Sequence, residues 1–368
     1  MAIQLIMKIK TCKTWLIAFS CSLLLLGLLG SCSSSPAKAS SGKAGGGKQI
    51  ILRADPFPNY AFHLYSIAEI NGRDSGYRAK YAGTLGFDDN EILRRYRELL
   101  TFSDGGGGPL AAVFCVIPMY IRPETPEEVR NYYEVVVRCV NNESFSELLE
   151  HYGEYFSRMN DMGGMDSNVA AQMMSQLTDY KDPVREMADV FIRNYQPFLE
   201  TVWPAEREIL NAQIAALQGR IHRENFIEKW EKLTGMVFKY DVYEIEMCTS
   251  LENVSNAVSP GYERNSFYYD GDEERFVTFI SHETGTHILD MSNTMYPLLN
   301  DYDGSLVYKA YETLALYYNQ RIAGTLNFGP YYDQERFFAI YENIEKKNPL
   351  IGPFDLLKEG IKEYTEKI

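Results

Sequence analysis

Five histidines occur in the 368 residues, and two of them lie in one short segment, residues 281–290, which reads SHETGTHILD. Glu283 follows His282 directly, and His287 comes five residues after His282. Imidazole nitrogens are good zinc ligands, and a neighbouring carboxylate can act as general base for water held by a metal ion. The segment therefore predicts a zinc-dependent hydrolytic site in which His282 and His287 bind Zn²⁺ and Glu283 is the catalytic base.

The spacing of the two histidines is one residue longer than a regular helix accommodates at a single metal ion. Side chains at i and i+4 lie about 40° apart around an α-helix, whereas those at i and i+5 lie about 140° apart. A single π-type turn would bring His282 and His287 onto one side. Gly285 between them is a poor helix former, about 1 kcal/mol worse than alanine. We expect a π-type turn here; the alternative is an ordinary helix with its histidines on different sides.

A third zinc ligand is predicted on the following helix. Glu312 lies 25 residues after His287, which leaves room for a turn and an antiparallel helix over residues 306–322. The rest of that helix is largely apolar and aromatic, so an unpaired carboxylate there is costly unless a cation neutralises it. Glu312 is therefore the predicted third ligand, and a solvent-facing Glu312 paired with Lys309 is the alternative.

These motifs resemble those of a known family. HETGTHIL, residues 282–289, resembles the HExxxH signature of the microtubule-associated tyrosine carboxypeptidase family and its bacterial relatives. Residues 308–315, YKAYETLA, resemble that family's Glu-Gly-Leu-Ala helix, with Glu312 at the ligand position and Thr313 in place of glycine. The resemblance covers about residues 275–325 and implies a zincin-type metallopeptidase. The departure at Thr313 leaves its substrate and its exopeptidase character open.

Further residues are candidates for supporting roles in the site. The segment 253–258 is a candidate edge strand for pairing with an extended peptide substrate. Two aspartates are reserve ligands, of which the first is better suited to hold a histidine N–H: Asp290 and Asp303. Four side chains near Glu312 in the sequence are candidates for contacting an oxyanion or the substrate: Tyr308, Tyr311, Tyr318 and Arg321. Three histidines are expected to be ordinary surface or capping residues: His63, His151 and His222.

The first 31 residues have the pattern of a bacterial lipoprotein signal peptide. Three lysines precede an apolar run over residues 15–29, which is too short to favour a permanent membrane span. Residues 29–32, LGSC, resemble the lipobox, which implies cleavage before Cys32 and acylation of its thiol by chains such as palmitate. The protein would then be held on a membrane of the cell envelope by lipid. Ser33 favours the outer membrane or cell surface.

Composition excludes several classes of function. The chain is 45% hydrophobic and 23% charged, as is typical of a globular protein. Its net charge of −14 becomes −17 once the three lysines of the leader are removed, which argues against nucleic acid as a partner. Three cysteines remain after the lipidation site, an odd number without CxxC spacing. They are expected to be buried thiols, or to include one disulfide between Cys115 and Cys139.

The order of predicted elements indicates an α+β protein that is predominantly helical. Residues 32–48 are rich in glycine and serine and predict a flexible tether. Residues 49–204 read mainly as helices, and residues 205–368 as helices, a short sheet and the histidine-bearing helix, a zincin-like half.

Three functions are compatible with these features. The first is a membrane-tethered zinc peptidase that acts on a peptide or protein substrate. The second is a non-catalytic surface lipoprotein that binds glycan or protein, with a structural or decayed metal site. The third is a metallo-hydrolase for a non-peptide bond. Stoichiometric zinc separates the first from the second, and cleavage of peptides separates the first from the third.

Overall fold

The computed structural model describes seven ranges of the chain: 47–70, 75–103, 106–159, 177–252, 258–261, 263–289 and 294–366. The predicted leader and Cys32 lie outside these ranges. Most of the described residues are helical and a small parallel sheet is present, which confirms the prediction of a mostly helical α+β protein. In these ranges we find no helix with the length and apolar character needed to cross a bilayer.

The chain divides into two compact units. The first contains residues 54–210 and 248–261, and the second contains residues 46–53, 211–247 and 262–368. The sequence predicts one boundary near residue 204, whereas the chain passes between the units several times. Short segments therefore pack with residues that are distant in the sequence. No change in local composition marks the points at which the chain passes from one unit to the other.

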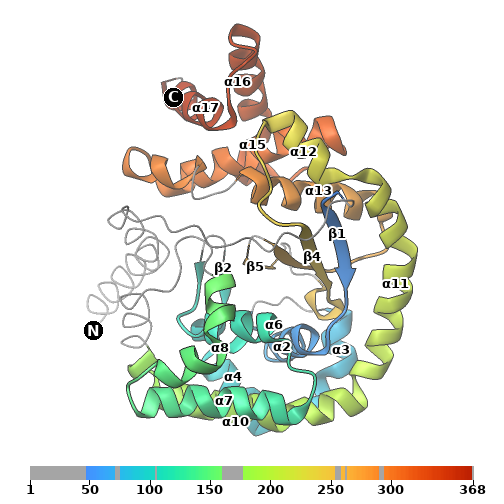
Figure 1. Ribbon diagram of the computed structural model, residues 1–368, viewed down its shortest axis with the longest axis vertical. Helices are drawn as coiled ribbons and strands as arrows, with labels where there is room; N and C mark the ends of the chain where they lie inside the picture. The colour runs from blue at the N-terminus through green and yellow to red at the C-terminus, as the bar shows by residue number, and fades with distance from the viewer. Residues whose placement is uncertain are drawn as a thin grey trace. The chain divides into compact units, whose positions relative to one another are not determined.

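Helices make up nearly all of the first unit (Figure 1). Helices α7 and α10 lie side by side, and the rings of Phe191 and Tyr195 on α10 pack against that of Tyr60 on α2. In chain order the elements are α2 (Pro56–Ile67), α3 (Gly76–Tyr81), η2 (Ala82–Thr84), α4 (Phe87–Arg95), α5 (Arg97–Leu100), β2 (Phe102–Ser103), β3 (Gly106–Gly107), η3 (Ala112–Val116), α6 (Ile117–Ile121), α7 (Pro126–Asn141), α8 (Ser146–Met159), α10 (Lys181–Thr201), η4 (Thr249–Leu251) and β5 (Val258–Gly261).

The apolar run over residues 110–121 folds as a helix and not as a strand. It opens with a π-helix, Ala112–Val116, that continues into α6. Pro118 has no N–H to donate to the carbonyl of Phe114, as an α-helix would require. The phenol of Tyr133 donates to that carbonyl instead, at 2.8 Å. The chain therefore does contain a π-helix, but it lies in the first unit and not between His282 and His287.

The second unit combines a parallel sheet with helices that cover it. Helix α11 begins in the first unit and continues into the second. In chain order the elements are β1 (Gln49–Arg53), α11 (Trp203–Glu224), α12 (Phe226–Thr234), β4 (Val242–Met247), β6 (Arg264–Phe267), α13 (Glu273–Leu289), η5 (Tyr296–Asn300), α15 (Gly304–Ile322), η6 (Pro330–Tyr332), α16 (Gln334–Lys347) and α17 (Pro353–Glu366). Figure 1 shows β1 and β4 running in the same direction, with α13 beside α15.

The sheet gives the second unit a fixed platform for α13. β4 pairs in parallel with β1 on one side and with β6 on the other. Because side chains alternate along a strand, Tyr243 of β4 and Asn265 and Phe267 of β6 point to one face. Tyr243 packs against the ring of His287, Asn265 donates to Glu283, and Phe267 packs against Phe279. That face therefore supports the helix that carries the predicted site.

The outer edge of β1 is closed by a side chain. The Gln218 amide of α11 accepts from the N–H of Leu52 at 2.7 Å and donates to the carbonyl of Ile50 at 2.9 Å. The amide thus imitates one residue of a neighbouring strand. Open strand edges pair with other chains, so this contact satisfies the edge and protects it.

Replacement of Gln218 by alanine should therefore lower the free energy of unfolding by about 1–2 kcal/mol, because two backbone groups lose their partner. Urea denaturation followed by far-UV circular dichroism measures the change. Gln213→Ala, half-buried on the same helix, is the matched control and should change stability by less than about 0.5 kcal/mol. Equal effects at the two positions would contradict the assigned edge contact.

Candidate active site

Helix α13 is regular through the predicted metal-binding segment. All residues of Glu273–Leu289 are described, and all are α-helical. The expected π-type turn is therefore wrong. His282 and His287 consequently lie about 140° apart around the helix, and Glu283 lies within the arc between them.

Close packing against α12 explains why the segment stays regular. The indole of Trp230 covers Gly285, where an added Cβ would overlap three ring atoms. Its Nε1 donates to the hydroxyl of Ser281, one turn earlier, at 3.1 Å. The glycine that looked like a helix defect is thus needed for interhelical contact. The Trp230 side of α13 lies opposite the arc that contains Glu283.

His282 is the most distinctive side chain of the segment. It is fully buried, and neither ring nitrogen has a hydrogen-bond partner within the described ranges. Its Nε2 lies 3.3 Å from Oε2 of Glu312 on α15. Two ligands of a tetrahedral zinc ion, each about 2.1 Å from the metal, are separated by about 3.4 Å. The orphaned imidazole and its distance from Glu312 therefore fit two ligands of one cation.

His287 has a different environment. It is largely buried, and the ring of Tyr243 meets it edge to face with centroids 5.2 Å apart. Within the described ranges, no group of three or more His, Cys, Asp or Glu side chains is assembled as a metal site. The structure thus brings His282 and Glu312 together, whereas His287 would have to join them by a change of its side-chain direction.

Glu283 lies where the catalytic base is expected. The residue is half-buried, and Oε2 of its carboxylate accepts from Nδ2 of Asn265 at 3.1 Å. Burial raises the pKa of Glu283 to about 7, and the nearby charge of His282 acts in the opposite direction. A carboxyl group with a pKa close to neutrality can both take up and release a proton. A bound cation would favour the ionised form.

The four residues near Glu312 that are candidates for contacting an oxyanion or the substrate lie on different sides of α15. Tyr308 is half-buried and, at one turn before Glu312, shares its side of the helix. Tyr311 is buried and donates its phenol to the carbonyl of Thr286 at 2.5 Å. That phenol ties α15 to α13 and is occupied.

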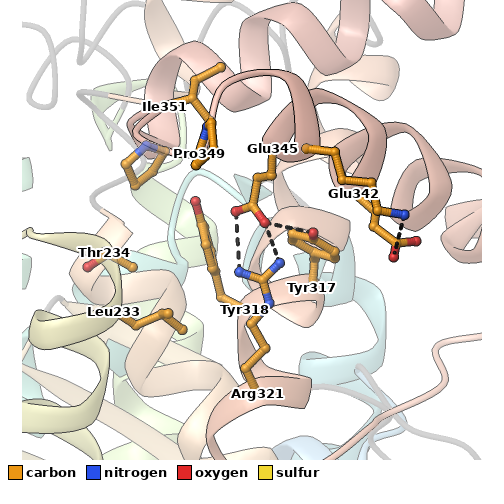
Figure 2. Close-up of a pocket in the computed structure, with 11 residues that line it drawn as sticks. Leu233, Thr234, Tyr317, Tyr318, Arg321, Glu342, Glu345, Pro349 and Ile351 are labelled. Carbon is orange, nitrogen blue, oxygen red and sulfur yellow. Dashed lines mark hydrogen bonds and ion pairs between the residues drawn. The ribbon is translucent and has the colours of Figure 1, made fainter.

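Tyr318 and Arg321 instead line a pocket of about 420 Å³ between α12, α15 and α16. Figure 2 shows the Arg321 guanidinium against the carboxylate of Glu345, with nitrogen–oxygen distances of 3.2 and 2.5 Å. Arg321 lies about 180° from Glu312 around α15. This pocket is therefore separate from the histidine site, and Arg321 already has an anionic partner.

Of the two reserve ligands, Asp303 lies in the described ranges and is placed away from the histidines. Asp303 is exposed and caps the N-terminus of α15 by accepting from the N–H groups of Ser305 and Leu306. It is occupied as a helix cap, a role that aspartate commonly fills. Asp290 and most of the candidate edge strand, residues 253–257, lie outside the described residues.

The other histidines differ from one another. His151 and His222 are exposed, as expected. His63 is buried in the first unit, which corrects the expectation of a surface or capping residue. Nδ1 hydrogen-bonds the phenol of Tyr77 at 2.9 Å and Nε2 the hydroxyl of Thr84 at 3.0 Å, and burial lowers its pKa to about 3. It is thus a neutral core residue.

The three cysteines of the described ranges are buried thiols. Cys115, Cys139 and Cys248 form no disulfide there, so the pairing of Cys115 with Cys139 is not formed and the expectation of buried thiols holds.

Several residues of the site could not be found by motif. Asn265 and Tyr243 come from the sheet, and Trp230 comes from α12. Phe328 follows α15 and packs perpendicular to the His282 ring, with centroids 4.9 Å apart. No local sequence motif links these residues to the histidines, because they belong to other segments of the chain. One signal in the sequence bears on them, the alternation of polar and apolar residues along β4, which puts Tyr243 on the same face as Ile245 and Met247.

Comparisons with known proteins leave this geometry as the basis for assigning function: no family model, no curated protein and no solved structure matches the chain.

Proposed function

We propose that the protein is a zinc-dependent peptidase. The observation that carries the proposal is the buried imidazole of His282, which has no hydrogen-bond partner on either nitrogen among the residues that the structure describes and lies 3.3 Å from the Glu312 carboxylate. A buried polar group without a partner is costly. A metal ion shared with Glu312 would remove that cost.

The observed distance supports two zinc ligands, and the site needs a third. His282 and Glu312 would hold the ion, and His287 would complete the set after its imidazole turns toward the arc that contains Glu283. Zinc so bound supplies a Lewis acid that polarises a carbonyl group and lowers the pKa of water. The zincin-like character of this unit belongs to the same proposal.

Individual side chains would then have separate roles in the reaction. The free oxygen of Glu283 takes a proton from the attacking water and returns it to the amine that leaves. The phenol of Tyr308 is the best placed of the candidate donors to the oxyanion, because it shares the side of α15 that carries Glu312. The substrate is a peptide or protein, and acyl chains on Cys32 would hold the enzyme at the cell envelope.

A non-catalytic protein with a structural or decayed metal site is the second candidate. The direction of His287, about 140° from His282 around α13, favours it. Hydrolysis of a non-peptide bond is the third. Metal content separates the first two, and the bond that is cut separates peptidase from other hydrolase.

The deciding experiment is zinc analysis of the purified chain together with cleavage of a casein-derived peptide pool. We expect about one zinc per chain and new amino termini. His282→Ala and Glu312→Ala should each lose at least about 90% of the zinc, because each removes a ligand.

His222→Ala, which alters an exposed histidine, should keep both properties. Zinc that is absent from the parent, or unchanged in His282→Ala, would contradict the metal site. Zinc without peptide cleavage would favour one of the other two functions.

A further inference from the structure

Asn265 lies in contact with the proposed catalytic base although it comes from a different element. It is the second residue of β6 and is completely buried. Its neighbours in β6, Arg264 and Ser266, point to the opposite face of the sheet. A buried asparagine on a strand is uncommon, because asparagine is depleted in strands and its amide must find partners. Its position therefore calls for a specific role.

The orientation of the Asn265 amide is determined by its contacts. Oδ1 accepts from the backbone N–H of Ser266 at 2.9 Å, so Nδ2 must point in the other direction. Nδ2 donates to Oε2 of Glu283 at 3.1 Å and lies 3.3 Å from the Tyr243 hydroxyl oxygen. A reversed amide would place its oxygen against the Glu283 carboxylate and its NH2 group against the N–H of Ser266, so both of those contacts would be lost.

The donor to Glu283 is also uncharged. The nearest cation on the strand, Arg264, is buried on the opposite face of the sheet and paired with Glu244 at 2.6 Å. A cation at the position of Asn265 would form an ion pair with Glu283. The amide of Asn265 instead gives the carboxylate one directed hydrogen bond, which fixes its orientation.

We propose that Asn265 is a positioning residue for the hydrolytic reaction. It holds Oε2 of Glu283 so that Oε1, which has no partner within the described ranges, is directed at the attacking water. Tyr243 lies beside this contact, since its hydroxyl touches Asn265 and its ring packs against the imidazole of His287. This inference rests on the proposed peptidase function.

The test compares kcat, KM and zinc content of the full chain, with the peptide that the parent cuts fastest in the casein-derived pool as the probe. Asn265→Ala should lower kcat about 10- to 100-fold, while KM and zinc content stay within about twofold. Asn265→Asp has nearly the same volume but places a second carboxylate against Glu283, so its kcat should fall at least as far. This variant keeps the test decisive if the alanine variant folds poorly.

Asn319→Ala is the matched control. Asn319 is equally buried in the same unit, but its Nδ2 donates to backbone carbonyls, those of Thr278 and Gly324. Its loss should lower the unfolding midpoint and leave kcat within about twofold. The role of Asn265 is overturned if Asn265→Ala or Asn265→Asp keeps the parent kcat, or if Asn319→Ala loses as much. A parent that cuts no peptide overturns the peptidase itself, which is a distinguishable result.

Discussion

Replacement of Glu283 by glutamine should lower kcat by about 10²- to 10⁴-fold while the protein keeps its zinc. Glutamine has almost the same shape as glutamate, so the helix and both histidines remain in place, but it cannot accept a proton from water. General-base catalysis contributes an effect of this size. The measurement is single-turnover cleavage of a peptide from the casein-derived pool, with zinc determined on the same samples.

Glu274→Gln is the control for this substitution. Glu274 begins the same helix, is exposed, and pairs with Arg220. An exposed ion pair contributes about 1 kcal/mol or less, so kcat should be unchanged. Full activity of Glu283→Gln would assign the base elsewhere, and loss of zinc together with activity would indicate that Glu283 is a ligand.

Replacement of Gly285 by alanine should destabilise the second unit by about 2–3 kcal/mol. The added Cβ would overlap the ring of Trp230, which is fully buried and cannot move without shifting α12 from α13. Overpacking of this kind usually costs about 1–3 kcal/mol, and a rigid aromatic neighbour places this position at the upper end. Urea denaturation of the zinc-free protein gives the difference.

Gly219→Ala is a control with the opposite expected sign. Gly219 is exposed on α11, and an added Cβ there would make only an ordinary contact with Arg223. Alanine should therefore stabilise the helix by up to about 1 kcal/mol. The smaller ring of Trp230→Phe should recover part of the loss caused by Gly285→Ala. Similar effects of the two glycine substitutions would contradict the close packing of α12 on α13.

Local chemistry made many elements predictable. Thr125 and Glu128 form the expected capping box at the start of α7, and Gly235 ends α12 in the left-handed conformation. Helix α15 also matches its predicted range within two residues. These signals depend on side chains within one turn of the helix end, so the sequence contains the whole interaction.

Contacts between distant segments were not predictable. Gly285 was interpreted as a sign of a helical defect, because its actual role depends on Trp230, a residue 55 positions earlier. The start of β6 is not marked by hydrophobicity either, since Arg264 and Asn265 are polar although buried. The proximity of His282 and Glu312 could be proposed from helix lengths, whereas Asn265 required the register of the sheet.

The pairing of β1 with β4 has a consequence for how the chain folds. During synthesis β1 emerges first among the described elements, but its partner follows about 190 residues later. Residues 54–210 can collapse among themselves in the meantime. The sheet that supports α13 must wait, because closing so long a loop is slow. The proposed site should therefore assemble late, only after β4 and the still later α15 have been made. A fragment that starts after Arg53 should leave the strand edge of β4 bare and prone to self-association.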